Sequence, residues 1–117
     1  MAKNYTDLTY LKSVTNNETS IIREMIELFI NQVPEFSENL NKFLAEKKYI
    51  ELGKEAHKAK SSLLVIGMEE LAKEMKTLQL LTLENKDIET YPDYVKKFDE
   101  QCNKAVEELK AELETVS

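Results

Sequence analysis

The chain has 117 residues, 42% of them hydrophobic and 32% charged, with only two glycines and two prolines. This composition is enough for one hydrophobic core and excludes both a turn-rich β architecture and a disordered chain. The net charge of −6 is unfavourable for the phosphates of nucleic acid, which require a basic surface, so we expect no nucleic-acid partner.

The hydrophobic pattern predicts helices along nearly the whole chain, beginning with a short helix over residues 7–13. A long helix should follow, because one stripe recurs in alternating steps of four and three residues: Ile22, Ile26, Phe29, Val33, Phe36, Leu40, Phe43 and, at its end, Lys47. Pro34 interrupts the hydrogen bonds of this helix but not the phase of its stripe. We therefore expect one kinked helix rather than two.

Three further helices are predicted after the long one. The first covers residues 49–66 and ends at Gly67, a natural left-handed terminator; the second follows at once, and the last begins near Pro92, after a polar break at residues 85–87. Their inward positions are Leu52, Ala56, Ala59, Leu63 and Ile66, then Met68, Leu71, Met75 and Leu78, then Tyr91, Val95, Phe98, Cys102, Ala105, Leu109, Leu113 and Val116. The predicted fold is all-α: an antiparallel up-and-down four-helix bundle with a short extra N-terminal helix, as a single domain over residues 1–117.

Cysteine, histidine and glycine are too few for several kinds of site. Cys102 alone cannot form an internal disulfide, and together with His57 it cannot supply the three or four ligands of a Cys/His zinc site, so we expect no metal site. Gly53 and Gly67 do not form a phosphate-binding loop for ATP or a dinucleotide, so we expect no cofactor. The longest aliphatic run, residues 63–66, is too short for a membrane span, and the polar N-terminus has no signal core; we expect a cytoplasmic protein without membrane contact.

Positive charge is concentrated in one stretch of this acidic chain. Residues 47–60 contain five lysines and two glutamates and carry a charge of +3, so the remainder carries −9. The only histidine, His57, lies inside this basic stretch. Neighbouring positive charge favours the neutral form of an imidazole, which is the nucleophilic form.

The helical spacing places His57 just outside the inward stripe, so we expect its imidazole to face solvent. Gly53 lies one turn before it and Ser61 one turn after it; both are small, and we expect them to keep the approach open for a phosphodonor protein. If the ring accepts a phosphoryl group, Lys60, with Lys54 or Lys58, could offset the new negative charge.

A docking surface for a partner is expected on the same side of the helix. Leu64 lies two turns after His57 on the outward face, and Lys58 and Met68 could flank it. These side chains would form a small apolar and basic patch.

A motif of regularly spaced residues surrounds the histidine. After Ala56 it contains His57, Lys60, the small residues Ser61 and Ser62, and then Ile66 and Gly67. This pattern resembles the histidine-containing phosphotransfer (HPt) domains of bacterial two-component phosphorelays. Residues 27–34 and 68–72 resemble the family's preceding and following helices, so the resemblance covers about residues 19–83. Two positions differ: Ser61 stands where many members have glycine, and Ala59 where many have leucine.

The resemblance implies a phosphorelay intermediate rather than an enzyme with its own ATP site. His57 would accept a phosphoryl group through Nε2 from the aspartyl phosphate of a receiver domain and pass it to another response regulator, and Lys60 would orient and stabilise it. Mg²⁺ would belong to the receiver. The implied partners are response-regulator receiver domains and a hybrid sensor kinase, and the family is usually monomeric. Partner-binding residues would be Gly53, Lys54, Lys58, Ser61, Leu64 and Met68.

Two other classes of function remain open at this stage. A small helical adaptor or scaffold without phosphotransfer would use the same bundle, and His57 would then be an ordinary surface histidine. A hydrolytic enzyme would need only one histidine, but the sequence contains no nucleophile elbow or glycine-rich oxyanion loop.

Overall fold

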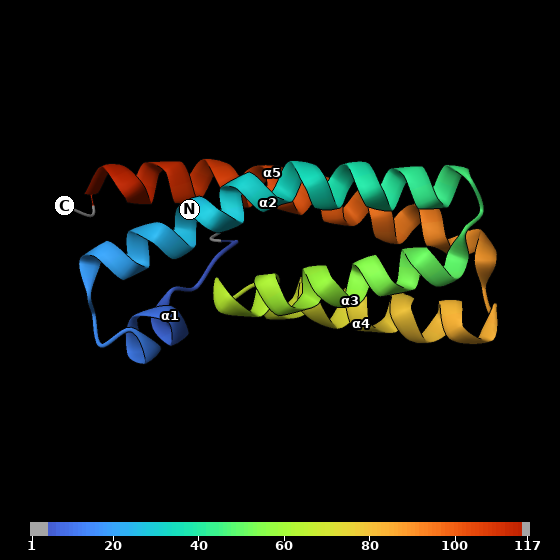
Figure 1. The fold of residues 1–117 in the computed structure, drawn as a ribbon, viewed down its shortest axis with the longest axis horizontal. Helices are drawn as coiled ribbons and strands as arrows, with labels where there is room; N and C mark the ends of the chain where they lie inside the picture. Colours follow the sequence, from blue (N-terminus) through green and yellow to red (C-terminus); the bar gives the residue numbers. More distant parts are fainter. Residues whose placement is uncertain (1–4, 116–117) are drawn as a thin grey trace.

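Helices make up the regular structure of residues 5–115, the part of the chain that the computed structural model describes. In chain order they are α1 (Thr9–Val14), α2 (Thr19–Ala45), α3 (Tyr49–Val65), α4 (Glu69–Glu84), the 3-10 helix η1 (Ile88–Thr90) and α5 (Tyr91–Thr115). Helices α2 to α5 form an antiparallel four-helix bundle, and α1 is a short extra helix (Figure 1). The predicted fold class is therefore confirmed.

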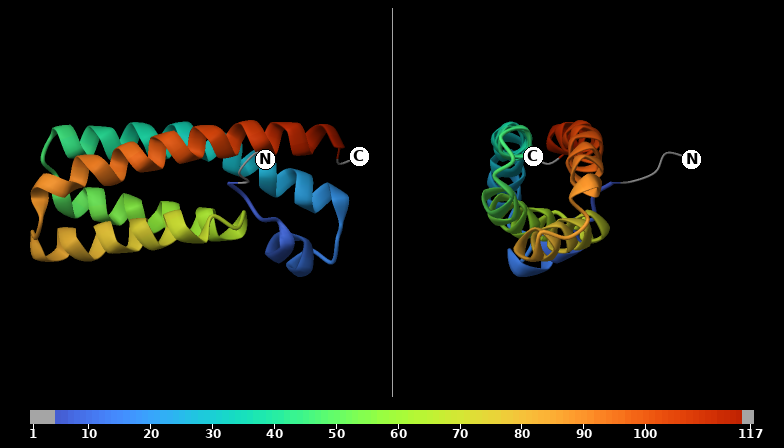
Figure 2. Two further views of the ribbon diagram at one scale, coloured as in Figure 1. Left: turned by 180° about the vertical axis from the view of Figure 1, so that it is seen from behind. Right: turned by 90° about the vertical axis from the view of Figure 1, so that its right-hand side faces the viewer.

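The two pairs of helices in the bundle differ in length. Helices α2 and α5 have 27 and 25 residues, whereas α3 and α4 have 17 and 16. The longer pair extends past one end of the α3–α4 hairpin, and α1 lies beyond that end (Figures 1 and 2). The side of α3 and α4 that points away from α2 and α5 is left as an outer face of the bundle (Figure 2).

The predicted apolar stripes form the core. All five inward positions predicted for α3 and all four predicted from Met68 to Leu78 are buried, as are the α5 positions from Tyr91 to Leu109. Leu113 is half-buried, and Val116 lies outside the described residues. Pro34 lies inside a single α2, as predicted, because the stripe on both sides of it packs against the same core.

The end of the α2 stripe differs from the prediction. Phe43 is only half-buried, and Lys47 lies beyond the helix, exposed in the turn to α3 with a φ of +57°. The helix ends before the stripe's expected last position because the chain must reverse there to begin α3. Within the described part of the chain, every helix is too short or too polar to span a membrane.

Gly67 ends α3 and also fixes the N-terminal segment. Its φ of +77° is the left-handed conformation that favours glycine, which confirms the prediction of a terminator. A Cβ atom at this position would overlap the carbonyl group of Asp7. The Asp7 backbone N–H donates a hydrogen bond to the carbonyl of Ile66 at 2.9 Å. The absence of a side chain at Gly67 thus lets the segment leading to α1 pack directly against the end of α3.

Candidate functional site

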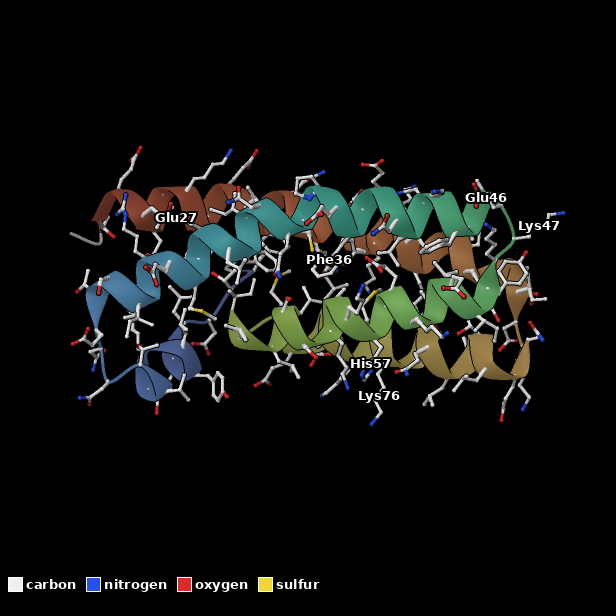
Figure 3. All side chains as sticks on the ribbon, in the orientation of Figure 1. Glu27, Phe36, Glu46, Lys47, His57 and Lys76 are labelled. Carbon is white, nitrogen blue, oxygen red and sulfur yellow. The ribbon has the colours of Figure 1, made fainter. Side chains whose placement is uncertain are left out.

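His57 projects from the middle of α3 on the outer face of the bundle (Figure 3). The side chain is exposed, as the sequence predicted, because Ala56 and Ala59 occupy the inward positions beside it and are fully buried. The imidazole thus projects from α3 into solvent, where a second protein can reach it.

Gln79 of α4 holds one side of the imidazole. Its Oε1 atom lies 3.2 Å from the Nδ1 atom of His57. A carbonyl oxygen can only accept a hydrogen bond, so this contact favours the tautomer in which Nδ1 carries the proton and donates it. In the neutral ring, the lone pair is then on Nε2, which makes Nε2 the nucleophilic atom. Sequence reasoning missed Gln79, because nothing within α4 alone indicates which α3 residue it contacts.

The structure divides the lysines near His57 into two kinds. Lys54 lies 4.0 Å from a carboxylate oxygen of Glu51, and Lys58 lies 3.6 Å from one of Glu55. Lys60 is partly buried and forms no ion pair with any carboxylate of residues 5–115. Its ammonium group is therefore the one predicted cation near His57 whose charge is not already balanced by a nearby acid in the described region.

A comparison of the sequence with protein-family models identifies the family of the chain. The model of the Hpt domain matches residues 24–117. The chain belongs to the Hpt domain family. No curated protein and no solved structure gives a significant match to the chain. Hpt domains are phosphocarriers in histidine phosphotransfer and interact with receiver domains and kinases, which agrees with a lone exposed imidazole. The match begins within α2 and leaves α1 outside it.

Gly53 has a different place in this Hpt domain from the one that the sequence suggested. It is buried between α3 and α4, so it does not keep a path open for an approaching protein. A Cβ atom there would overlap Oγ1 of Thr82 and would lie 3.5 Å from Cα of Gln79. Gly53 instead lets α4 approach α3 closely, one turn away from His57. This close approach is what brings Gln79 within reach of the imidazole.

Met68 must also be removed from the predicted docking patch. It is 4% exposed and precedes the first turn of α4, so its side chain belongs to the core. Leu64 is 44% exposed and Ser61 is exposed, as the patch requires. Both line a cavity of about 740 Å³ at the surface, together with Tyr10 of α1. The surface around Leu64 is therefore continued towards the end of α3 by Tyr10 of α1 rather than by Met68.

Glu55 is a buried acid that the sequence reasoning did not single out. Its carboxylate accepts a hydrogen bond of 2.9 Å from Nδ2 of Asn39 on α2, and the residue is 6% exposed. Because Lys58 pairs with the same carboxylate, its ammonium group is held near a buried acid. Lys54 and Lys58 are both exposed, so their predicted part in partner binding stays a prediction.

The polar groups at the site are an imidazole, an amide and ammonium groups. Among residues 5–115, no three His, Cys, Asp or Glu side chains converge in a way that could hold a metal ion. The thiol of Cys102 is buried in the core, away from this face. The arrangement can thus present a nucleophilic nitrogen beside positive charge.

Proposed function

We propose that this Hpt domain is a phosphorelay intermediate, in which His57 accepts a phosphoryl group from the aspartyl phosphate of one receiver domain and passes it to the receiver of another response regulator. The observation that carries the proposal is the hydrogen bond between Nδ1 of His57 and Oε1 of Gln79 on an exposed imidazole. It leaves Nε2 as the atom that attacks.

The transfer step needs no proton donor or acceptor from this chain. The lone pair of Nε2 forms the new N–P bond while the bond between phosphorus and the aspartyl oxygen breaks, and the aspartate leaves as a carboxylate. The proton on Nδ1 stays in its hydrogen bond to Gln79. Onward transfer is the same step in reverse, with a carboxylate of the second receiver as the nucleophile. Such transfers depend mainly on positioning and on stabilising the charge of the phosphoryl oxygens.

Lys60 supplies part of that charge stabilisation. It lies one helical turn after His57 and has no ion pair within the described region, so its ammonium group is free to turn towards the phosphoryl oxygens. We propose that Mg²⁺ and its carboxylate ligands come from the receiver and that this chain binds no ATP. It would act as a monomer, in the compartment that holds its receivers and a hybrid sensor kinase.

An adaptor without phosphotransfer is the alternative. It would use the helical bundle as a scaffold, and the imidazole would have no chemical role. Two features favour the relay, because a scaffold requires neither: the contact of Nδ1 of His57 with Gln79, and a Lys60 that forms no ion pair with the acids of residues 5–115.

The proposal is tested by adding a receiver that carries a labelled aspartyl phosphate. The wild-type chain should take up a label that is stable in base and labile in acid, and His57→Gln should take up none while keeping its helical circular dichroism. Lys60→Ala should slow the uptake, whereas Lys110→Ala on α5 should not. Stable binding of the receiver without any transfer of label would support the adaptor instead.

A further inference from the structure

Lys76 of α4 lies on the same side of the bundle as His57. It precedes Gln79 by three residues, so the two side chains occupy one face of α4, one turn apart. Lys76 is exposed, and Figure 3 shows that its side chain and that of His57 project from the same side of the molecule. The family resemblance in the sequence gave no reason to single it out.

The register between the two helices places Lys76 opposite Lys60. Helices α3 and α4 are antiparallel, and the contact of His57 with Gln79 fixes how they are aligned. One turn towards the C-terminus of α3 leads from His57 to Lys60, and one turn towards the N-terminus of α4 leads from Gln79 to Lys76. Both lysines therefore lie on the same side of the imidazole, one on each helix.

Neither lysine is neutralised within the described region. Lys73, one turn earlier on α4, pairs with Glu70 at 3.7 Å, but Lys60 and Lys76 have no ion pair with any acid of residues 5–115. Two facing cations without an acid between them repel each other. Such an arrangement is unfavourable in the empty site and becomes favourable when an anion is placed between the two ammonium groups.

We propose that Lys60 and Lys76 form a binding site for the phosphoryl group on Nε2 of His57, with one ammonium group contributed by each helix. The ligand is a phosphoryl dianion. This inference rests on the proposed function, and it adds Lys76 as a residue that contacts the transferred group. Because Lys76 acts on the phosphoryl group itself, its effect does not depend on which molecule donates that group.

The experiment therefore uses a donor that has no docking surface. Phosphoramidate transfers its phosphoryl group to histidine and releases ammonia, so it reports on His57 without any receiver. Because an exposed ion pair typically contributes up to about 1 kcal/mol, Lys76→Gln should slow labelling by about two- to fivefold. The deficit should be the same with a phosphorylated receiver as the donor, and it should shrink at 1 M salt, which screens exposed charges. Lys73→Gln is the matched control and should label at the wild-type rate.

A second measurement does not depend on rates. The ³¹P chemical shift of phosphorylated His57 at neutral pH, where phosphohistidine is stable, reports on the surroundings of the phosphoryl group. A nearby cation changes the electron distribution around phosphorus, so Lys76→Gln should move this signal, while Lys73→Gln should leave it unchanged.

The outcomes separate the two proposals. If Lys76→Gln slows transfer from the receiver but not from phosphoramidate, and leaves the ³¹P chemical shift unchanged, Lys76 belongs to the docking surface and the lysine site is wrong. If receivers never label the wild-type chain but phosphoramidate labels His57 with the expected dependence on Lys76, the lysine site stands and the relay function is wrong.

Discussion

Gln79 and His57 are 22 positions apart in the sequence, yet Oε1 of one lies 3.2 Å from Nδ1 of the other. The contact exists because α3 and α4 pack closely at Gly53, where a side chain would overlap Thr82. The packing of two helices therefore decides which nitrogen of the histidine is available for reaction.

The tautomer of His57 can be measured directly, because it is the only histidine in the chain. At a pH where the ring is neutral, ¹⁵N-detected NMR should show the proton on Nδ1 in the wild type. Gln79→Ala removes the acceptor, so the proton should move towards Nε2, which free histidine prefers, and labelling of His57 should become slower. The helical circular dichroism should not change, since the Gln79 side chain is not part of the hydrophobic core. A wild-type spectrum dominated by the Nε2–H form would contradict the role given to Gln79.

The packing at Gly53 predicts an unusual effect on stability. Gly→Ala within a helix normally stabilises by about 1 kcal/mol. Here the added Cβ would overlap Oγ1 of Thr82, and overpacking of this kind costs about 1 to 3 kcal/mol. Gly53→Ala should therefore lower the free energy of unfolding, as measured by urea denaturation.

The matched control for this prediction is the same substitution in a Thr82→Ala background. Without the hydroxyl, the nearest atom of residue 82 is its Cβ at 3.2 Å, so Gly53→Ala should destabilise much less there. If Gly53→Ala stabilises both backgrounds equally, α3 and α4 do not pack as closely as described.

Because the thiol of Cys102 is buried, the wild type and a Cys102→Ala variant should differ in how much stability they lose at alkaline pH. Burial raises the pKa of its thiol from 9.0 to about 12, and the negative charge of Asp99 acts in the same direction. The folded state thus disfavours the thiolate, so this contribution to stability is complete below pH 9 and is lost as the pH rises from 9 towards 12. The loss should reach up to about 1.4 kcal/mol per pH unit within that window.

The measurement compares the wild type with Cys102→Ala by urea unfolding at pH 8 and at pH 10.5. Lysines and tyrosines titrate in both proteins and cancel in the comparison. The wild type should lose more stability between the two pH values than the variant. Equal losses would mean that the thiol is not buried in solution.

The sequence was sufficient for most of the fold, because each helix carries its own apolar stripe. The inward positions of α3 and the terminator at Gly67 followed from periodicity and backbone preference alone. The same periodicity placed His57 on the outer face. The prediction was wrong for Lys47, where the stripe of α2 was continued past the end of the helix. It was also wrong for the place of Met68 in the docking patch, because the Met68 side chain is buried in the core, as its position in the apolar stripe required.

The rest of the candidate site depends on how two helices are aligned. Gln79 and Lys76 become relevant only once α4 is placed against α3, and periodicity within one helix does not contain that register. Gly53 was assigned to an open approach for the same reason, because its neighbour across the helix pair, Thr82, was unknown. Contacts between distant segments were the missing information.

The relay proposed above requires that Nε2 of His57 carry the phosphoryl group. The most direct measurement is ³¹P and ¹⁵N NMR of the chain after it has been phosphorylated by a receiver. We expect one phosphohistidine signal, with phosphorus bonded to Nε2 and the proton retained on Nδ1. A phosphoryl group on Nδ1 or on another residue, or no phosphorylated product with any receiver of the same cell, would contradict it.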